Sequence, residues 1–308
     1  MKKRSIIAMM LATCVFVNQV SMADAVSTAN TSSNYIDVEI SENNFPDKNL
    51  REVLSVVYDK NRDNKISAVE LDEKSRTLQI DSFGGGYQVI DYKYIKSCED
   101  ASKLVSDLTG IERLNLKVLS VFDNNGLKSV DLSRCDSLEE VYIEKVKNLR
   151  EVKLGSNVTN LDLNRISLKS YDFSKQTRLK RVHLSALGNK KKTVKLPTKN
   201  LIDLKVIACN NTNFKFLGAK SKKRVFFEFY GTKLKKLDLK KFKNIYAVHL
   251  TERPRIGTID MRSNTAKTAM GTSNKKELKK VIVKNKKMIK KLKKHNGKGV
   301  HYKFVVKK

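Results

Sequence analysis

The strongest constraint on the fold is a hydrophobic frame, hydrophobic-x-x-hydrophobic-x-hydrophobic, that recurs at a step of about 11 residues between Leu116 and Val283. Successive frames begin at Leu116, Leu127, Leu138 and Leu149 without a break in the step. A fixed period of this kind indicates repeated units that bury their apolar faces only against their neighbours. We therefore expect a solenoid in which each unit stacks on the one before it.

Each frame predicts one short strand. Its last two apolar residues alternate with a polar one, as in Val130-Asp131-Leu132, and this period of two is typical of a strand with one buried face. Two successive frames make one coil of about 21 to 22 residues, so we expect two strands per coil and two parallel sheets, one on each flank. The frame is poorly kept between residues 186 and 230, which leaves the number of coils there open.

The frames at residues 127–135 and 168–176 resemble the short nested leucine-rich repeats of secreted bacterial proteins. The resemblance covers roughly residues 110–283 and implies a leucine-rich repeat solenoid. In that family the position eight residues after the first Leu is often Asn or Cys, turned inward to satisfy backbone groups at the bend. Here the position holds Asn124, Cys135, Asn157 and Cys209, whereas Val146, Ile166 and Leu187 depart from the pattern.

An acidic loop at residues 59–70 follows apolar residues at helical spacing, with Asp47 as the expected helix cap. Oxygen-bearing side chains occupy positions 1, 3, 5, 9 and 12 of this loop, and Asn64 replaces the usual glycine while tolerating a left-handed backbone. The loop resembles an EF-hand, which implies one structural Ca²⁺ ion. Its alternative is a helix-turn-helix with a solvated acidic loop. The implied ligands are Asp59, Asn61, Asp63, Lys65, Ser67 and Glu70.

The chain divides into six expected segments. Basic residues before a short apolar run, followed by small residues near Ala25, predict a secretory signal peptide. No later apolar run could hold the mature chain in a membrane, so we expect a secreted, extracellular protein and leave cell-wall association open. The segments are a signal peptide at 1–25, a flexible leader at 26–42, an EF-hand-like helix-loop-helix at 43–77, a connector and N-terminal cap at 78–115, the leucine-rich repeat solenoid at 116–283 and a basic C-terminal cap at 284–308.

The net charge of +31 is unevenly distributed. Residues 26–115 are net acidic, whereas residues 275–308 hold 15 lysines against one glutamate. Such a field attracts polyanions, which for an exported protein include teichoic acids, anionic lipids, sulphated glycans and DNA. It does not imply sequence-specific recognition of nucleic acid. The alternative is that the lysines keep a largely exposed array soluble.

The sequence does not predict an enzyme. It contains no recognised catalytic motif, and its histidines are scattered, with His183 and His249 in outward-facing strand positions. After signal removal three widely spaced cysteines remain, which indicates neither a disulfide framework nor a metal site.

We expect a surface-associated binding or adhesion protein that is braced by Ca²⁺ and engages a protein or glycan through its strand face. The alternative is a structural wall protein held non-covalently on teichoic acid by its lysine-rich half. A single exposed face is expected to carry the partner contacts, namely Lys128, Asp131, Lys153, Lys169, Asp172, Lys180, His183, Lys236 and His249.

Overall fold

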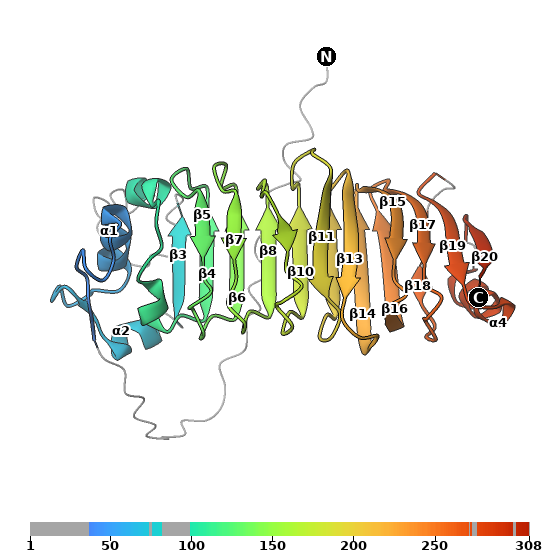
Figure 1. Cartoon of the computed structure of the whole chain (residues 1–308), viewed down its shortest axis with the longest axis horizontal. Helices are drawn as coiled ribbons and strands as arrows, with labels where there is room; N and C mark the ends of the chain where they lie inside the picture. Colours follow the sequence, from blue (N-terminus) through green and yellow to red (C-terminus); the bar gives the residue numbers. More distant parts are fainter. Residues whose placement is uncertain are drawn as a thin grey trace, which may run out of the picture. The chain divides into compact units, whose positions relative to one another are not determined.

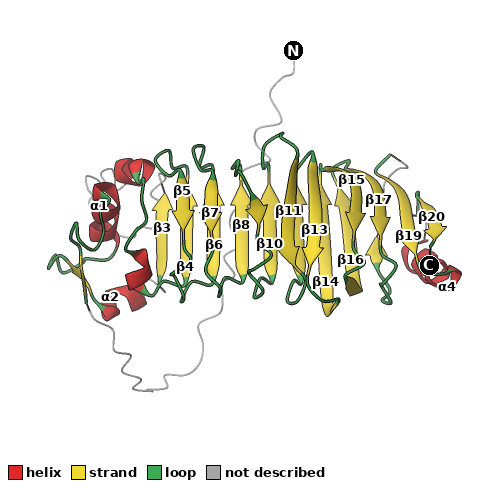
Figure 2. Ribbon diagram, in the orientation of Figure 1, coloured by secondary structure: helices red, strands yellow, loops and turns green. Residues whose placement is uncertain are grey.

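The computed structural model describes residues 37–73, 76–81, 99–270, 272, 276–297 and 300–307. The expected signal peptide, most of the expected leader and part of the connector lie outside these residues. Within them the chain forms a parallel β-solenoid (Figure 1), with helices at the two ends of the stack (Figure 2). The predicted solenoid is thereby confirmed.

One flank is a continuous nine-stranded sheet, called the main sheet below. All its neighbouring strands are parallel. In chain order, which is also their order in the sheet, they are β3 (Thr77–Asp81), β4 (Val118–Phe122), β6 (Glu140–Glu144), β8 (Asn160–Asn164), β10 (Arg181–Ser185), β12 (Asp203–Ile207), β14 (Ser221–Tyr230), β16 (Phe242–Thr251) and β18 (Ala269–Met270).

The other flank, called the second flank below, consists of three shorter parallel ladders. Because its strands alternate along the chain with those of the main sheet, the prediction of two strands per coil and a sheet on each flank is confirmed. The ladders are β5 (Ser129–Asp131) with β7 (Glu151–Lys153), then β9 (Tyr171–Asp172), β11 (Lys192–Pro197) and β13 (Thr212–Leu217), and last β15 (Lys233–Asp238), β17 (Arg255–Asp260), β19 (Leu278–Val283) and β20 (Lys303–Val306).

The strand register shows that coil length varies slightly along the stack. Val118 pairs with Glu140 and Glu140 pairs with Asn160, so the second of these coils is a little shorter than the first. Asp203 pairs with Phe226, which makes that coil a little longer than both. The expected length of about 21 to 22 residues lies in the middle of this narrow range.

Stacking continues through residues 186–230, where the frame is hard to recognise. Phenylalanines take four of the buried positions there, and Phe227 of β14 is fully buried. Its ring centroid lies 6.1 Å from that of Phe216 on the second flank and 5.1 Å from that of Phe242 on the main sheet. These edge-to-face contacts join the two flanks across the core.

A left-handed bend follows each of the strands β4, β6, β8, β10 and β12. A non-glycine residue with φ between 48° and 56° stands directly after the strand. Its N–H donates, at 2.9 to 3.0 Å, to the carbonyl of the last strand residue in the next coil. The hydrogen bond offsets the strain of this conformation in part. The bend residues are Asp123, Lys145, Arg165, Ala186 and Ala208.

In the coils that follow β4 to β12 the predicted inward position comes directly after each bend and is buried whether its residue is polar or apolar. Cys135 and Asn157 instead follow second-flank strands, and of these two Cys135 is buried whereas Asn157 is only half-buried. Asn124 donates from Nδ2 to the carbonyls of Ser102 and Val105 at 2.7 and 2.9 Å. Its Oδ1 accepts from the N–H of Leu127 at 2.8 Å. The Cys209 thiol bonds similarly to backbone carbonyls, so both residues satisfy buried backbone groups as expected.

The N-terminal part contains α1 (Lys48–Val57), α2 (Ala68–Glu73) and the antiparallel pair β1 (Val38–Glu39) and β2 (Lys65–Ile66). Asp47 caps α1 as predicted, because its Oδ1 accepts from the N–H of Leu50 at 2.8 Å. Its Oδ2 accepts from the N–H and hydroxyl of Ser106. Although burial raises the pKa of Asp47, these hydrogen bonds outweigh it and hold the pKa below its usual value.

Several boundaries differ from the expected segments. The end of the expected leader is ordered, because β1 pairs with the loop strand β2. β3 extends the main sheet before residue 116, and β20 extends the second flank beyond residue 283. The step from Thr77 to Val118 is much longer than one coil and interrupts the period, which hides β3 from a search for repeats.

Helical segments stand at both ends of the stack (Figure 2). Residues 99–104 are helical, and their end is bonded to the first bend through Asn124. A short 3-10 helix, η1 (Ile111–Leu114), leads from this segment into β4. At the other end α4 (Lys286–Asn296) is joined to β18, since Asn296 accepts from the N–H of Met270 and donates to the carbonyl of Thr268. No helix within the described residues is both long and apolar enough to span a membrane.

Candidate functional site

The nine predicted partner residues do not lie on one surface. Successive frames alternate between the flanks, so only every second frame contributes to a given face. Lys180, His183 and His249 lie on or beside the main sheet. The other six belong to the second flank and its turns, which corrects the expectation of a single face: Lys128, Asp131, Lys153, Lys169, Asp172 and Lys236.

The main sheet carries an unbroken outward column of side chains at the middle of its strands. Sequence analysis missed six of its members, although following every second frame would have found four of them, namely Ser120, Tyr142, Asp162 and Lys205. Glu228 lies in the stretch where the frame is poorly kept. Paired strand by strand, the column runs Gln79, Ser120, Tyr142, Asp162, His183, Lys205, Glu228 and His249.

Neighbours in this column hold each other in place. His183 Nδ1 lies 2.7 Å from Asp162 Oδ2, and Lys205 Nζ lies 3.5 Å from Glu228 Oε2. The Tyr142 hydroxyl donates to the Glu140 carboxylate. The pKa of Tyr142 is raised, first by burial and second by this hydrogen bond. These contacts fix side chains that would otherwise be free to rotate, which lowers the entropy cost of binding a partner.

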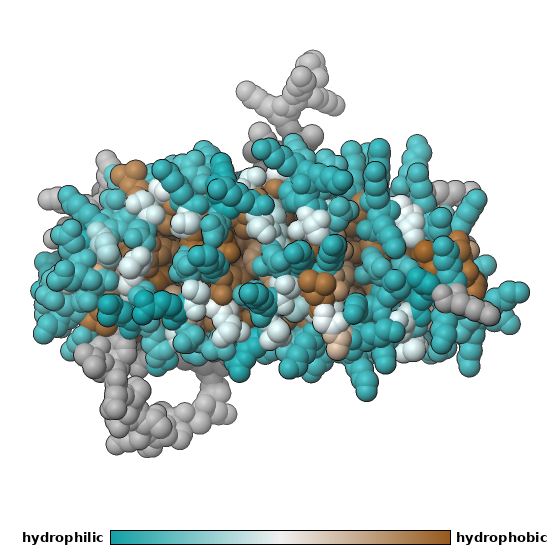
Figure 3. All heavy atoms as spheres, in the orientation of Figure 1, coloured by the Kyte–Doolittle hydropathy of each residue, from teal (hydrophilic) through white to brown (hydrophobic). Residues whose placement is uncertain are grey.

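Exposed aromatic side chains accompany the column. Tyr142, Tyr230 and Tyr246 are 37%, 41% and 47% exposed, which leaves their rings available for contact. The Arg224 guanidinium lies 3.8 Å from the centre of the Tyr246 ring. Tyrosine and arginine are enriched where proteins bind partners. Figure 3 shows patches of hydrophobic residues in the middle of the viewed face, interrupted by hydrophilic residues that also line both long edges.

The main sheet differs in charge from the chain as a whole. The three outward columns shared by β4 to β16 contain two basic residues, Arg181 and Lys205, although the net charge is +31. Burial, reinforced by Glu228, raises the pKa of Asp203 in spite of Arg181. The same three columns contain more acidic than basic residues, with five acidic ones, namely Glu140, Glu144, Asp162, Asp203 and Glu228.

The second flank has paired charges in its first coils. Lys153 Nζ lies 3.0 Å from Asp131 Oδ2, and Lys195 Nζ lies 2.7 Å from Asp172 Oδ2. Hydrogen bonds from Lys195, which is the larger cause, and from Ser174 lower the pKa of Asp172 to about 2. Each lysine therefore faces an aspartate one coil away.

The last coils of the second flank lack this alternation. Lys233 pairs with Arg255 in the strand register, and Lys280 pairs with Lys303. Neighbouring strands lie about 4.8 Å apart, so these cations repel one another unless anions from outside screen them. This part of the flank is a polycationic surface.

The predicted calcium loop has the local geometry of a closed turn. Asn64 has φ of 63°, as its left-handed position requires. Both carboxylate oxygens of Asp59 accept from loop N–H groups, those of Asp63 and Asn64, at 3.0 Å. Glu70 Oε1 accepts from the N–H of Lys60 at 3.0 Å, so the two ends of the loop meet.

Glu70 also has a role that requires no metal. Its Oε2 accepts from the N–H of Ser67 at 2.8 Å, while the N–H of Glu70 donates to the Ser67 hydroxyl at 3.3 Å. This reciprocal capping box begins α2. In the described part of the chain no three His, Cys, Asp or Glu side chains lie close enough to hold a metal ion. The donors fit calcium in chemistry, but they are engaged by backbone N–H groups.

The buried thiols are excluded from chemistry at the surface. Cys135 and Cys209 are buried and unpaired. Burial, aided by Glu112, raises the pKa of Cys135 to about 12, which suppresses its reactive thiolate. Cys98 lies outside the described residues.

The geometry therefore defines a parallel β-solenoid with two chemically different outer faces. The chain matches no protein-family model, and no curated protein is significantly similar to it in sequence.

Proposed function

We propose that the protein is a secreted or surface-associated binding protein of the leucine-rich repeat type, without catalytic activity. The outward face of the main sheet engages a protein or glycan partner, and the EF-hand-like loop braces the N-terminal end with Ca²⁺. The observation that carries the proposal is the continuous column from Tyr142 to His249, in which polar side chains are held by their neighbours.

The chemistry of this face supports recognition rather than solubility alone. A face that served only solubility would resemble the rest of this lysine-rich surface. Instead its outward columns from β4 to β16 combine exposed tyrosines with an acidic excess. Repeat proteins build binding surfaces from such columns, because each coil adds one strand to an extended platform.

A Ca²⁺ ion would be held by Asp59, Asn61, Asp63, the Lys65 carbonyl, Ser67 and Glu70. Its charge would draw the loop carboxylates together and fix β2 against β1. Calorimetry tests this brace with Glu70→Gln and, as a matched control, Glu42→Gln on the exposed residue Glu42. We expect the heat of Ca²⁺ binding to disappear only in Glu70→Gln, and equal heats in both variants would contradict the brace.

The last coils of the second flank support a second candidate function, retention on an anionic polymer such as teichoic acid. Its specific observation is the run of cations that face cations in the register, as at Lys280 and Lys303. Attachment of this kind is driven by release of counterions and falls steeply with salt.

Co-sedimentation with purified Gram-positive cell walls separates the two functions. Residues 26–308 are compared at low and high salt, on walls with and without teichoic acid, alongside the double variant Tyr142→Ala/His183→Ala. Binding that survives salt and loss of teichoic acid but disappears in the variant supports the main-sheet function. Binding that disappears with salt or teichoic acid, and is unchanged in the variant, supports retention alone.

A further inference from the structure

A groove of about 740 Å³ lies at the turns that follow the later strands of the second flank. It is walled by the turns after β13, β15, β17 and β19 and by the start of α4, and no acidic residue lines it. Seven cationic side chains do so, namely Lys220, Lys240, Lys243, Arg262, Lys284, Lys287 and Lys291.

Three of these cations occupy equivalent positions in successive coils. Asp238 pairs with Asp260, and Asp260 pairs with Ile282. Two residues after each of these positions stand Lys240, Arg262 and Lys284, respectively. The strand spacing of about 4.8 Å therefore sets these three cations in a row along the groove.

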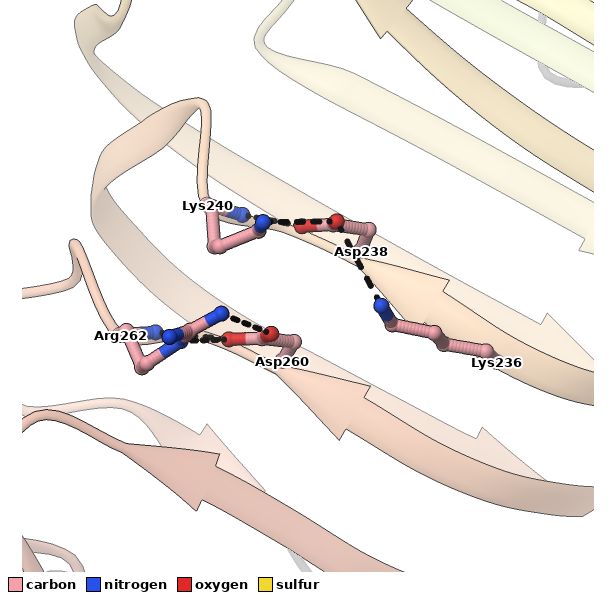
Figure 4. A network of polar contacts seen from close by, with 5 residues as sticks. All are labelled: Lys236, Asp238, Lys240, Asp260 and Arg262. Atoms are coloured by element: carbon pink, nitrogen blue, oxygen red, sulfur yellow. Dashed lines mark hydrogen bonds and ion pairs between the residues drawn. The ribbon is translucent and has the colours of Figure 1, made fainter. Parts of the chain in front are cut away.

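The first two members of the row each pair with an aspartate (Figure 4). Lys240 Nζ lies 3.3 Å from Asp238 Oδ2. Arg262 forms a two-pronged pair with the buried Asp260, with both bonds at 3.0 Å. In the third coil Ile282 replaces the aspartate, so the row ends on a charge without this partner.

The start of α4 adds to the uncompensated charge. Asn285 caps the helix by accepting from the N–H of Met288 at 3.0 Å. The first turn contains no acidic residue, and Lys287 lies in it beside the groove. A helix N-terminus carries partial positive charge, so lysine there is unfavourable unless an anion is present. Within the described residues, Lys243, Lys284 and Lys287 have no carboxylate partner.

We propose that this groove binds the phosphate groups of a phosphodiester polymer. The proposal deepens the retention function and rests on it. Asp260 already engages the one guanidinium of the lining, so the available cationic groups are lysine ammoniums beside the start of α4, which suit phosphate oxygens. The row of cations across successive coils suits an anion that repeats along a chain.

Calorimetry with poly(glycerol phosphate) at fixed salt tests the groove. The groove variant is Lys243→Gln/Lys284→Gln/Lys287→Gln. The matched control, Lys147→Gln/Lys175→Gln/Lys190→Gln, removes the same charge from exposed lysines outside the groove lining. We expect the affinity to fall by about tenfold or more in the groove variant and by about threefold or less in the control. Circular dichroism verifies that both variants fold, and removal of like charges from the groove favours folding.

Other outcomes overturn the proposal at different levels. Equal losses in both variants, or none in either, would show that retention depends on net charge and that the groove is not a site. Equally tight binding of dextran sulfate, lost in the same variant, would overturn the assignment to phosphate. A wild-type protein that does not bind the polymer at all would overturn the retention function together with the groove. Should the groove variant not fold, a rise in the Tm of the wild type with polymer, absent in Lys284→Gln, supports the proposal, and equal rises overturn it.

Discussion

The two faces of the solenoid are built from the same coils but differ in charge. On the main sheet a histidine faces an aspartate and a lysine faces a glutamate, and in the outward columns shared by β4 to β16 acidic residues outnumber basic ones. On the last coils of the second flank lysine faces lysine or arginine. A need for solubility alone would act equally on both faces. Under the proposed function, the two faces would therefore meet different partners.

Two adjacent phenylalanines test whether the faces share one core, and this comparison has the largest expected effect. Phe227 is fully buried between the flanks, whereas Phe226 is half-buried and packs edge-to-face on His249 at 4.8 Å. We expect Phe227→Ala to lower the free energy of unfolding by about 3 to 5 kcal/mol. Phe226→Ala is expected to lower it by about 1 kcal/mol. Urea unfolding measures both, and equal losses would show that the core does not join the faces there.

A smaller effect is expected from Tyr142→Ala on the main sheet. Loss of an exposed tyrosine from a binding face is expected to lower affinity by about tenfold or more. Leu217→Ala is the matched control, because Leu217 is similarly exposed, at 39%, but lies on the second flank. Salt-resistant binding to cell walls measures both, and a larger loss in Leu217→Ala would transfer the partner site to the second flank.

The bends provide a test that is independent of both faces. Ala208 has φ of 49°, a conformation that disfavours residues with a Cβ. We expect Ala208→Gly to stabilise the protein by about 0.5 to 1 kcal/mol, since the relief of strain exceeds the added entropy of the unfolded chain. The Tm measures the change. Ala219→Gly, outside the left-handed positions, is expected to lower the Tm slightly.

The smallest effect concerns the paired charges of the second flank. The pKa of Asp172, about 2, lies below the value of 3.8 for a free side chain. Its stabilisation is therefore present at neutral pH and is lost as the pH falls from about 4 to about 2. Because the pair is 39% to 41% exposed, solvent screening keeps its contribution below about 1 kcal/mol. Asp172→Asn should remove this part of the acid dependence of Tm, and an unchanged profile would show that the pair contributes nothing.

The sequence predicted the existence of strands better than their assignment to faces. The apolar frame around Val130 and Leu132 marks a strand wherever it occurs, because burial on one side requires that alternation. Both flanks use the same frame, so it does not reveal which face Asp131 or Asp162 belongs to. Only the strand register separates the two residues.

Two further features could not be read from the chain. The left-handed bends are occupied by Asp, Lys, Arg and Ala rather than glycine, so composition does not mark them. The groove combines turns of different coils, from Lys220 to Lys291, which only the stacking brings together. In contrast, the inward role of Asn124 and the cap at Asp47 were predicted, because each depends on neighbouring backbone groups.

The left-handed bends also bear on how such a chain can change in length. The N–H of each bend residue donates to the carbonyl of the last residue of the neighbouring main-sheet strand, one coil further on. This corner of the coil is therefore held to a single geometry in the coils from Asp123 to Ala208. The variation in length between one coil and the next is therefore accommodated in the rest of the circuit. A segment cut from one bend to the next is a self-consistent module. Duplicating or deleting such a module would lengthen or shorten both faces together and preserve the register of the coils that remain.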